Sequence, residues 1–392
     1  MNSLSYVSLA IYFIAMLAIG LFAYRKSTDD VSGYILGGRQ VSPHVTALSA
    51  GASDMSGWML MGLPGAMFLV GFETLYIALG LLIGALINYL VVAPKLRVYT
   101  EVADNALTIP EFFAKRFGQA DNSIRIIAAA IIVIFFTLYT SAGLVAGGKL
   151  FESAFGLNYD IGLVVTLAVV VSYTLLGGFL AVSLTDFVQG CIMFVALVLV
   201  PFVAYQEFTS ADRMMNFAYQ SIPHFTDAMQ NVTLLGLISS LSWGLGYFGQ
   251  PHIIVRFMAI RSVADIKTAR RIGISWMTVT IIGALATGLV GIAYANKFGM
   301  KLSDPETIFI VFSELLFHPL ISGFLLAAIL AAIMSTISSQ LLVSSSSLTE
   351  DIYRTLSKKQ ASEQEMVKMG RYGVAGVAIV ATLLALDRSN SI

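Results

Sequence analysis

The chain has 392 residues, of which 57% are hydrophobic and only 12% are charged, and its mean hydropathy is +0.82. Lys and Arg together number 23, as do Asp and Glu, so there is no basic field that would attract nucleic acid. This balance excludes soluble enzymes, disordered chains and disulfide-rich secreted modules, and it predicts a membrane protein with many spans.

Charge-free apolar runs predict ten transmembrane helices, because one span needs about 20 apolar residues. In chain order they cover residues 4–24, 43–70, 74–94, 124–150, 159–180, 183–206, 231–252, 272–296, 318–348 and 370–387. Most of the 23 basic residues fall in the odd-numbered loops, and we expect none of them within the membrane. The positive-inside rule then places the odd loops in the cytoplasm and the N-terminus outside.

Two of these spans are rich in glycine and proline. Residues 47–68 contain four glycines and Pro64, and residues 239–252 contain three glycines and Pro251. Glycine for close helix packing would explain either segment alone. Together, however, they predict broken helices whose freed backbone groups line a cavity. The two spans are five apart and run in opposite directions, which is the pattern of an inverted repeat with a binding site between the breaks.

The predicted architecture is an all-α polytopic membrane protein that forms a single transporter domain over residues 1–392. An additional first helix at 4–24 precedes a first five-helix repeat at about 43–206. The second repeat, at about 231–392, is incomplete, since its fifth helix would follow the last predicted span.

Asp54 is the only charged residue between Arg39 and Glu73, and it lies at mid-depth of the second span. A charge at the bilayer centre costs ~3 kcal/mol or more, so such a residue usually has a function. Two interpretations remain open. Asp54 takes part in cation binding or coupling, or it is a structural carboxylate that caps the break in its helix.

The ninth span crowds hydroxyl side chains, among them Ser335 and Thr336, into its second half. Most such hydroxyls bond back to their own helix. Two of them, with carbonyls freed at the break in residues 47–68, would form a neutral oxygen cage suited to Na⁺, which is a hard ion.

Three aromatic residues are candidates for a substrate site. Trp243 and Tyr247 are four residues apart and so share a face of the broken seventh span, and Tyr139 lies in the fourth. Aromatic pairs usually serve packing, but their place inside the broken segment favours a wall for a small solute. His252 and His318 lie near span ends, where we expect no proton relay.

Six long motifs carry a resemblance to a known family. They read YILGGR at 34–39, ALSAGASDMSGWMLMGLPGA at 47–66, NALTIPEFF at 105–113, GGFLAVSLTDFVQG at 177–190, WGLGYFGQPHIIVRFMA at 243–259 and LLAAILAAIMSTISSQLLVSSSSLTEDIY at 325–353. The chain resembles the sodium:solute symporter family, and within it the sodium/proline symporters.

The resemblance implies a leucine-transporter-like inverted repeat with one extra N-terminal helix, of which this chain lacks the last helices. It implies Na⁺-coupled symport of L-proline into the cell by alternating access, in a bacterial plasma membrane, and no enzymatic activity. The implied partners are L-proline, Na⁺ and the lipid bilayer, with no cofactor besides the coupling ion, no nucleic acid and no obligatory protein partner.

The resemblance also implies site residues. The Na⁺ site corresponds to the carbonyls of Ala52, Met55 and Ala332 and the hydroxyls of Ser335 and Thr336, with Asp54 tied to ion affinity. The substrate site corresponds to Ser56, Gly57, Tyr139, Trp243, Tyr247 and Pro251. Arg39, Asp186 and Gln189 match further family positions, and for each of them a structural role is an equal alternative.

Other functions give different expectations. Another Na⁺-coupled solute, such as a betaine-like osmolyte, pantothenate, sialic acid or a sugar, would use the same architecture and differ in competition assays. A channel would need a continuous polar stripe along several helices, and a sensor would need a soluble signalling domain. An intramembrane enzyme would need a nucleophile–base pair or a metal cluster, which Asp54 alone does not provide.

Overall fold

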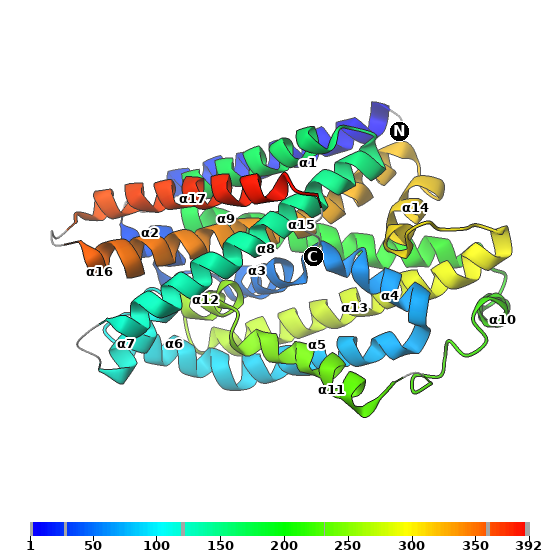
Figure 1. Ribbon diagram of the computed structural model, residues 1–392, viewed down its shortest axis with the longest axis horizontal. Coiled ribbons are helices and arrows are strands. Elements are labelled where there is room, and N and C mark those ends of the chain that lie inside the picture. Colours follow the sequence, from blue (N-terminus) through cyan, green and yellow to red (C-terminus); the bar gives the residue numbers. More distant parts are fainter. Residues whose placement is uncertain (1–2, 27–29, 119–121, 231, 358–360, 389–392) are drawn as a thin grey trace.

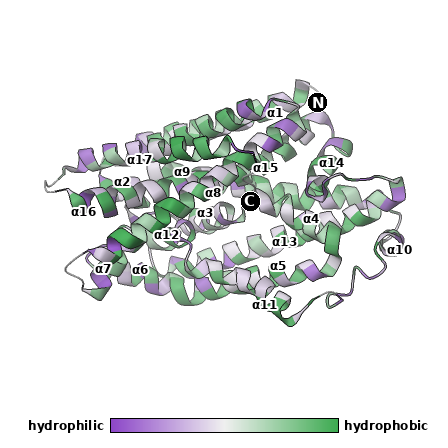
Figure 2. Cartoon of the chain, viewed as in Figure 1, coloured by the Kyte–Doolittle hydropathy of each residue, from purple (hydrophilic) through white to green (hydrophobic). Residues whose placement is uncertain are grey.

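The computed structural model describes residues 3–26, 30–118, 122–230, 232–357 and 361–388. In these residues the regular elements are all helices, apart from an isolated bridge between Val41 and Ile260. The longer helices lie roughly along one axis (Figure 1). Apolar residues predominate along the middle of the bundle, and hydrophilic residues gather toward its ends (Figure 2). Seven of the described helices are long and apolar enough to cross a membrane, as expected of a multi-pass protein.

The first half of the chain contains the second predicted span as two helices, α3 and α4, separated by a non-α segment. Its elements are α1 (Ser3–Lys26), α2 (Val31–Leu36), η1 (Gly37–Arg39), α3 (Pro43–Met55), η2 (Gly57–Met59), α4 (Gly62–Val70), η3 (Gly71–Thr74), α5 (Leu75–Ile87), the π-helical η4 (Asn88–Val92), α6 (Ala93–Val102), α7 (Ile109–Phe117), α8 (Ser123–Phe155) and α9 (Tyr159–Tyr205).

The second half contains the seventh predicted span as α11 and α12, again joined by a non-α segment. Its elements are α10 (Ala211–Ser221), α11 (Leu234–Ser242), η5 (Trp243–Phe248), α12 (Pro251–Ala259), α13 (Asp265–Phe298), η6 (Pro305–Thr307), α14 (Ile308–Leu315), α15 (Pro319–Ser346), the π-helical η7 (Ser347–Tyr353), α16 (Arg354–Leu356) and α17 (Glu363–Ala385). Residue 231, where we expected this span to begin, lies outside the described residues. Both predicted breaks are thus confirmed.

The two broken helices run in opposite directions, as predicted. Val41, just before α3, accepts a backbone hydrogen bond from Arg261 and donates one to Ala259 at the end of α12. At the other end of the bundle, Gly71 follows α4 and packs against the backbone of Phe225, which precedes α11. One broken helix therefore starts where the other ends, which gives the pair the inverted geometry of a repeat.

Helix α9 contains two of the predicted spans, because the chain reverses at Gly178. This residue has φ 52° and ψ −140°, a conformation that L residues with a side chain rarely adopt. Before it, the helix packs parallel to α1, with Tyr173 against Gly20 and Gly177 against Tyr24. After it, the chain runs back in the direction opposite to the first half and parallel to α13, with Gly190 against Trp276 and Leu197 against Gly283. The short connection predicted between the fifth and sixth spans is confirmed.

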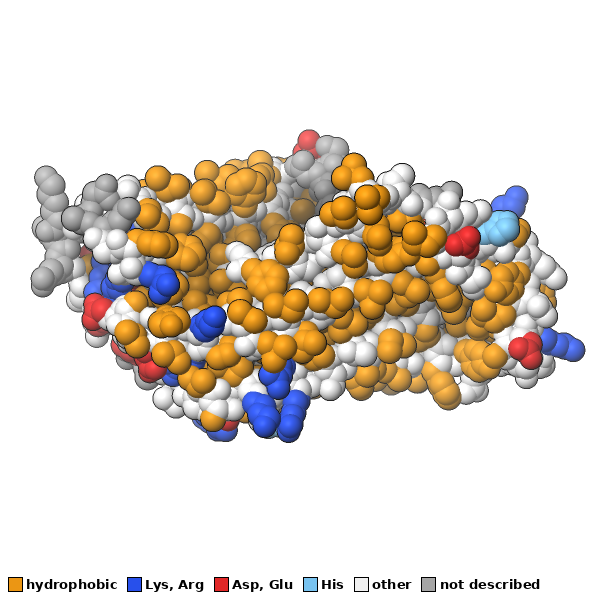
Figure 3. Space-filling model, turned by 90° about the horizontal axis from the view of Figure 1, so that it is seen from below, with side chains coloured by type: hydrophobic (Ala, Val, Ile, Leu, Met, Phe, Trp, Pro, Cys, Tyr) orange, Lys and Arg blue, Asp and Glu red, His pale blue; other side chains and the backbone are white. Residues whose placement is uncertain are grey.

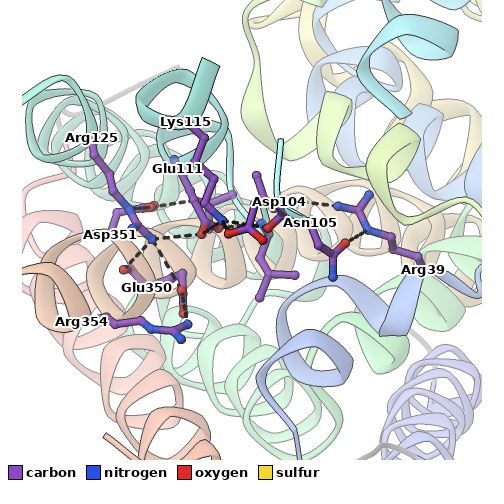
Figure 4. Close-up of polar contacts among 12 residues, drawn as sticks. Arg39, Asp104, Asn105, Glu111, Lys115, Arg125, Glu350, Asp351 and Arg354 are labelled. Carbon is purple, nitrogen blue, oxygen red and sulfur yellow. Dashed lines mark hydrogen bonds and ion pairs between the residues drawn. The ribbon is translucent and has the colours of Figure 1, made fainter. Parts of the chain in front are cut away.

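Basic residues gather at one end of the molecule, which we call the basic end. The ends of α1, α6, α12 and α16 and the starts of α2, α8, α13 and α17 lie there, and most Lys and Arg side chains visible in Figure 3 lie toward it. A cluster of ion pairs joins the helices there (Figure 4). Arg125 reaches Asp351 at 2.8 Å, Glu350 at 3.5 Å and Glu111 at 3.7 Å, and so links α8 to η7 and α7.

Close backbone packing on the second broken helix gives a stability prediction. A Cβ atom on Gly84 of α5 would lie 2.3 Å from the carbonyl oxygen of Gly244, so Gly84→Val cannot be accommodated without a backbone shift. Overpacking of this kind costs about 1–3 kcal/mol or more. We expect Gly84→Val to lower the thermal midpoint of the detergent-purified protein clearly. Gly376→Val in α17, where no atom lies within 4 Å, is the control, and equal midpoints would contradict the prediction.

Candidate functional site

The end of α3 brings the Ala52 carbonyl next to the Ser335 hydroxyl of α15, where the Thr336 hydroxyl and the Ala332 carbonyl also lie. The Ser335 hydroxyl lies 2.8 Å from the Ala52 carbonyl oxygen and 3.0 Å from that of Ala332. The Thr336 hydroxyl lies 3.2 Å from the Ala332 oxygen. Ala52 and Met55 are among the last four residues of α3, whose carbonyls a helix end leaves without regular partners. The structure thus brings four of the five predicted Na⁺ ligands together, namely Ala52, Ala332, Ser335 and Thr336. The fifth, Met55, is the last residue of α3, in the same turn as Ala52.

This arrangement has the chemistry of a site for a hard monovalent cation. Its donors are uncharged oxygens, and Ala52, Ala332, Ser335 and Thr336 are all buried. In the described part of the chain, no group of three His, Cys, Asp or Glu side chains is placed to hold a metal ion. Neutral oxygen ligands suit Na⁺ better than a transition metal, which prefers imidazole or thiolate.

Asp54 joins the two broken helices. It lies in the last turn of α3, and its carboxylate accepts a hydrogen bond from the Tyr247 hydroxyl in η5. The structure pairs it with this tyrosine rather than with the hydroxyls of α15. A direct place for Asp54 in the ion site therefore stays a prediction, whereas its position between the two breaks is established.

Other predicted substrate residues surround the same two breaks. Ser56 has φ 46°, and its hydroxyl accepts a bond from the Trp58 amide at 3.3 Å. The Tyr139 side chain of α8 lies against Ser56. Trp243 is 52% exposed and stacks on Trp58 with ring centroids 5.5 Å apart. The aromatic wall predicted for one helix is therefore shared between both.

Of the two remaining predicted substrate residues, Gly57 lies at the first break, whereas Pro251 lines a different cavity. A Cβ atom on Gly57 would lie 3.0 Å from Ile333 of α15, so glycine permits close packing of the first break on α15. Pro251 opens α12, where its missing N–H costs nothing. It lines a separate small cavity with Ile35 and Phe179, and the structure does not bring it to Tyr247.

Two cavities of unequal size flank the breaks. Toward the basic end, a cavity of about 20 Å³ is enclosed by α3, α5, η4, α12 and α13, with Asp54 and Tyr247 in its wall. On the opposite side, a cavity of about 220 Å³ leads to Trp58 and is lined by charged residues that include Lys149 and Glu306. Burial and the neighbouring Asp304 raise the pKa of Glu306. The larger of these two cavities thus lies on the side away from the basic end.

Two polar residues of the smaller cavity were not predicted from the sequence. Asn88 and Tyr89 belong to the π-helical η4, and both side chains are buried in the cavity wall. The Asn88 amide oxygen and the Tyr89 hydroxyl have no hydrogen-bond partner in the part of the chain that the structure describes. An asparagine within an apolar span was the available signal. The π-helix, which is common at functional sites, has no such signal in the sequence.

The expectation that Arg256 lies in a loop after the seventh span is wrong. The seventh span does not end at residue 252, because α12 continues it to Ala259, and Arg256 is fully buried. Its guanidinium pairs with Asp186 of α9 at 3.1 Å and also bonds to Ser49 and Ser339. A buried arginine is tolerated only with such partners.

The two histidines also differ from each other. His252 is buried and packs edge-on against Phe136 at 5.2 Å, so the expectation that it lies near a span end is wrong for the same reason. His318 does lie at a span end. It is exposed, and its ring nitrogen caps the first turn of α15 at Leu320.

Arg39 lies at the basic end, where it is the last residue of η1. It donates to Asn105 at 2.9 Å, as Figure 4 shows, and to the Met258 carbonyl of α12 at 2.8 Å. Burial, followed by the charge of Arg97, lowers the pKa of Arg39 to about 10, so it stays charged at neutral pH. Its contacts tie η1 to the connection after α6 and to the end of α12.

Comparisons with known proteins agree with this geometry. The model of the sodium:solute symporter family matches residues 34–392. The osmoregulated proline transporter OpuE of Bacillus subtilis (strain 168) is 60% identical over 386 residues, covering 98% of this chain and 78% of that protein. A sodium/proline symporter of Staphylococcus aureus (strain JH9) is 53% identical over 394 residues, covering 100% and 77%.

A solved structure is similar over almost the whole chain. It is described as the substrate-bound outward-open state of a Na⁺-coupled sialic acid symporter, and it matches with a TM-score of 0.87 at 20% identity. The match covers 98% of this chain and 82% of that one. This likeness shows the fold, the leucine-transporter-like inverted repeat with α1 as the extra N-terminal helix.

Proposed function

The chain belongs to the sodium:solute symporter family, and we propose that it carries L-proline into the cell together with Na⁺ by alternating access. The observation that carries this proposal is the meeting of three elements at the breaks. The carbonyl of Ala52 meets the Ser335 hydroxyl, and Asp54 of the same helix end bonds to Tyr247 of the other broken helix. Relatives at 53–60% identity bear the names of a proline transporter and a sodium/proline symporter, which supports proline as the solute.

The proposed Na⁺ site is the oxygen cage between α3 and α15. The ion would replace the hydrogen bond from Ser335 to Ala52 and be held by the carbonyls of Ala52, Met55 and Ala332 and the hydroxyls of Ser335 and Thr336. Asp54, which lies between Ala52 and Met55 in the last turn of α3, would supply negative charge near this ion. The ion thereby ties a broken helix to the central helix α15, which biases the conformation that accepts proline.

The proposed proline site lies between the breaks, among Ser56, Gly57, Tyr139, Trp243 and Tyr247. Proline has a carboxylate, a charged ring nitrogen and an apolar ring, and this pocket offers hydroxyls, one carboxylate and aromatic faces. Asp54 and the Tyr247 hydroxyl would meet the ring nitrogen and carboxylate, and the aromatic rings would pack on the pyrrolidine. Pro251 acts on this site from a distance, through the start of α12.

Orientation follows from charge. We place the basic end in the cytoplasm of a bacterial cell and the N-terminus outside. Residues at about 43–206 and from about 231 onward then form the two inverted repeats. The larger cavity lined by Lys149 and Glu306 faces the outside, and this arrangement suits entry of proline from that side.

Coupling between the two ligands is reciprocal: if Na⁺ raises proline affinity by some factor, proline must raise Na⁺ affinity by the same factor. A coupling of about 1–3 kcal/mol is typical between such sites. The membrane potential adds about 2.3 kcal/mol per charge per 100 mV to the inward drive.

Uptake measurements test the function directly. We expect proteoliposomes with the full-length protein to accumulate radiolabelled L-proline at least about tenfold faster with an inward Na⁺ gradient than with choline, as coupling of this size implies. Unlabelled proline should compete, whereas glycine betaine, pantothenate, sialic acid and galactose should not. Uptake indifferent to Na⁺ would rule out the ion, and competition by one of the other solutes would rule out proline specificity.

A further inference from the structure

A buried polar network joins the extra helix α1 to α9 and α15. Its members are Tyr12 of α1, Tyr173 and Gln189 of α9, and Met334 of α15, and all four side chains are 5% exposed or less. Because α1 lies outside both repeats, nothing in the repeat architecture requires it to send a polar side chain into the core.

Both tyrosine hydroxyls converge on Met334. Tyr12 accepts a hydrogen bond from the Gln189 amide nitrogen at 2.8 Å and donates toward the Met334 sulfur at 3.5 Å. Tyr173 donates to the Met334 carbonyl oxygen at 3.3 Å. Helix α1 and the first half of α9 therefore hold the same residue of α15, and the second half of α9 supports Tyr12 through Gln189.

Met334 directly precedes the proposed ion ligands Ser335 and Thr336 in the chain. On the neighbouring face of the same helical turn, Ser335 reaches Ala52 of α3. Successive residues of a helix differ by about 100° in direction, so contacts on Met334 set the rotation and depth at which Ser335 meets α3.

We propose that Tyr12 and Tyr173 are positioning residues for the Na⁺ site, which fix α15 against α3 through Met334. The proposal rests on the proposed function and deepens it, because it assigns a part in ion binding to the helix that stands outside the repeats. Neither tyrosine touches the ion cage itself.

The hydroxyl groups, rather than the rings, carry this role. Phenylalanine at either position would fill the same apolar volume. Removing the Tyr12 hydroxyl, however, would leave the Gln189 amide nitrogen without its partner, and the amide oxygen of Gln189 already has none among the described residues. A buried amide with neither group bonded is costly, so Gln189 and the adjoining turn of α15 would rearrange.

The test compares the Na⁺ dependence of proline uptake in the wild-type protein and in Tyr12→Phe, Tyr173→Phe and Tyr6→Phe. We expect each of the first two to raise the Na⁺ concentration for half-maximal uptake about fivefold. The maximal rate and the KM for proline at saturating Na⁺ should stay within about twofold of wild type. Tyr6→Phe is the matched control, because Tyr6 lies on the same helix and its hydroxyl bonds to Phe155 at 2.7 Å, remote from the cage.

Binding of ²²Na⁺ to the purified variants without proline gives a second readout. Unchanged Na⁺ dependence in both core variants, or the same shift in Tyr6→Phe, would overturn the proposal. So would failure of both core variants to fold while Tyr6→Phe folds, because the hydroxyls would then serve folding. If wild-type uptake itself ignores Na⁺, the proposed function fails, whereas a Na⁺-dependent wild type with unshifted variants refutes only the positioning role.

Discussion

Replacing Asp54 with asparagine is expected to reduce Na⁺-driven proline uptake about 100-fold, because hydrogen bonds to charged groups contribute about 1.5–3 kcal/mol. Asparagine keeps the size of the side chain and removes only its charge. The substitution weakens the hydrogen bond from Tyr247 that joins the two broken helices. It also removes the negative charge next to the proposed ion cage. Initial rates of radiolabelled proline uptake, normalised to the amount of protein in the membrane, measure the effect.

Two further variants make this prediction specific. Asp160→Asn changes an exposed aspartate in the first turn of α9 and should transport like wild type. Tyr247→Phe should impair uptake alone but add little in the Asp54→Asn background, because residues that act through one contact are not additive. Independent, fully additive effects of Asp54→Asn and Tyr247→Phe would mean that their hydrogen bond has no part in transport.

Local features of the sequence account for the successful fold predictions. Glycine and proline weaken a helix wherever they occur, so composition could place the breaks within residues 47–68 and 239–252, and the structure has them at 56–61 and 243–250. Counting spans then gave the opposite directions of the two broken helices, since parity does not depend on packing. The contact of Ser335 with Ala52 agrees with the predicted meeting of a hydroxyl on one apolar helix and a freed carbonyl on another, while Na⁺ binding there stays a prediction.

The errors concern residues whose partners lie far away in the chain. Arg256 looked like a loop residue because a charged side chain marks the end of an apolar run. Its partner Asp186 is 70 positions earlier and lies beside it only in the folded bundle. His252 was misplaced by the same early span boundary. The contact of Tyr12 with Gln189 spans 177 positions and has no local signature either.

These long-range contacts share one physical role. Arg256, Tyr12 and Tyr173 each hold an element near the breaks against the helices around it, through polar groups that burial makes costly to leave unpaired. A transporter must keep its ion ligands in register while the helices move. The proposed ligands follow from the family motifs in the sequence, whereas the groups that hold those residues in place appear only in three dimensions.

Removing the two hydroxyls of the ion cage should have the second largest effect, and it acts on Na⁺ rather than on proline. Each of Ser335→Ala and Thr336→Ala removes one oxygen from the proposed cage, and we expect a rise of about tenfold in the Na⁺ concentration for half-maximal uptake, since one hydrogen bond contributes about 1 kcal/mol or more. The double variant should lose Na⁺ stimulation in the physiological range. Alanine keeps the helix, because it is the strongest helix former.

The control for Ser335→Ala and Thr336→Ala is Ser346→Ala, on the same helix. Ser346 is also buried, and its hydroxyl bonds back to the Leu342 carbonyl at 2.7 Å, so Ser346→Ala removes a hydroxyl of the ordinary helical kind. It should leave the Na⁺ dependence unchanged, while the KM for proline at saturating Na⁺ should change little in any of the single variants. If Ser335→Ala plus Thr336→Ala transports with wild-type Na⁺ dependence, the ion binds elsewhere. A loss of proline affinity at all Na⁺ concentrations would instead assign these hydroxyls to the substrate.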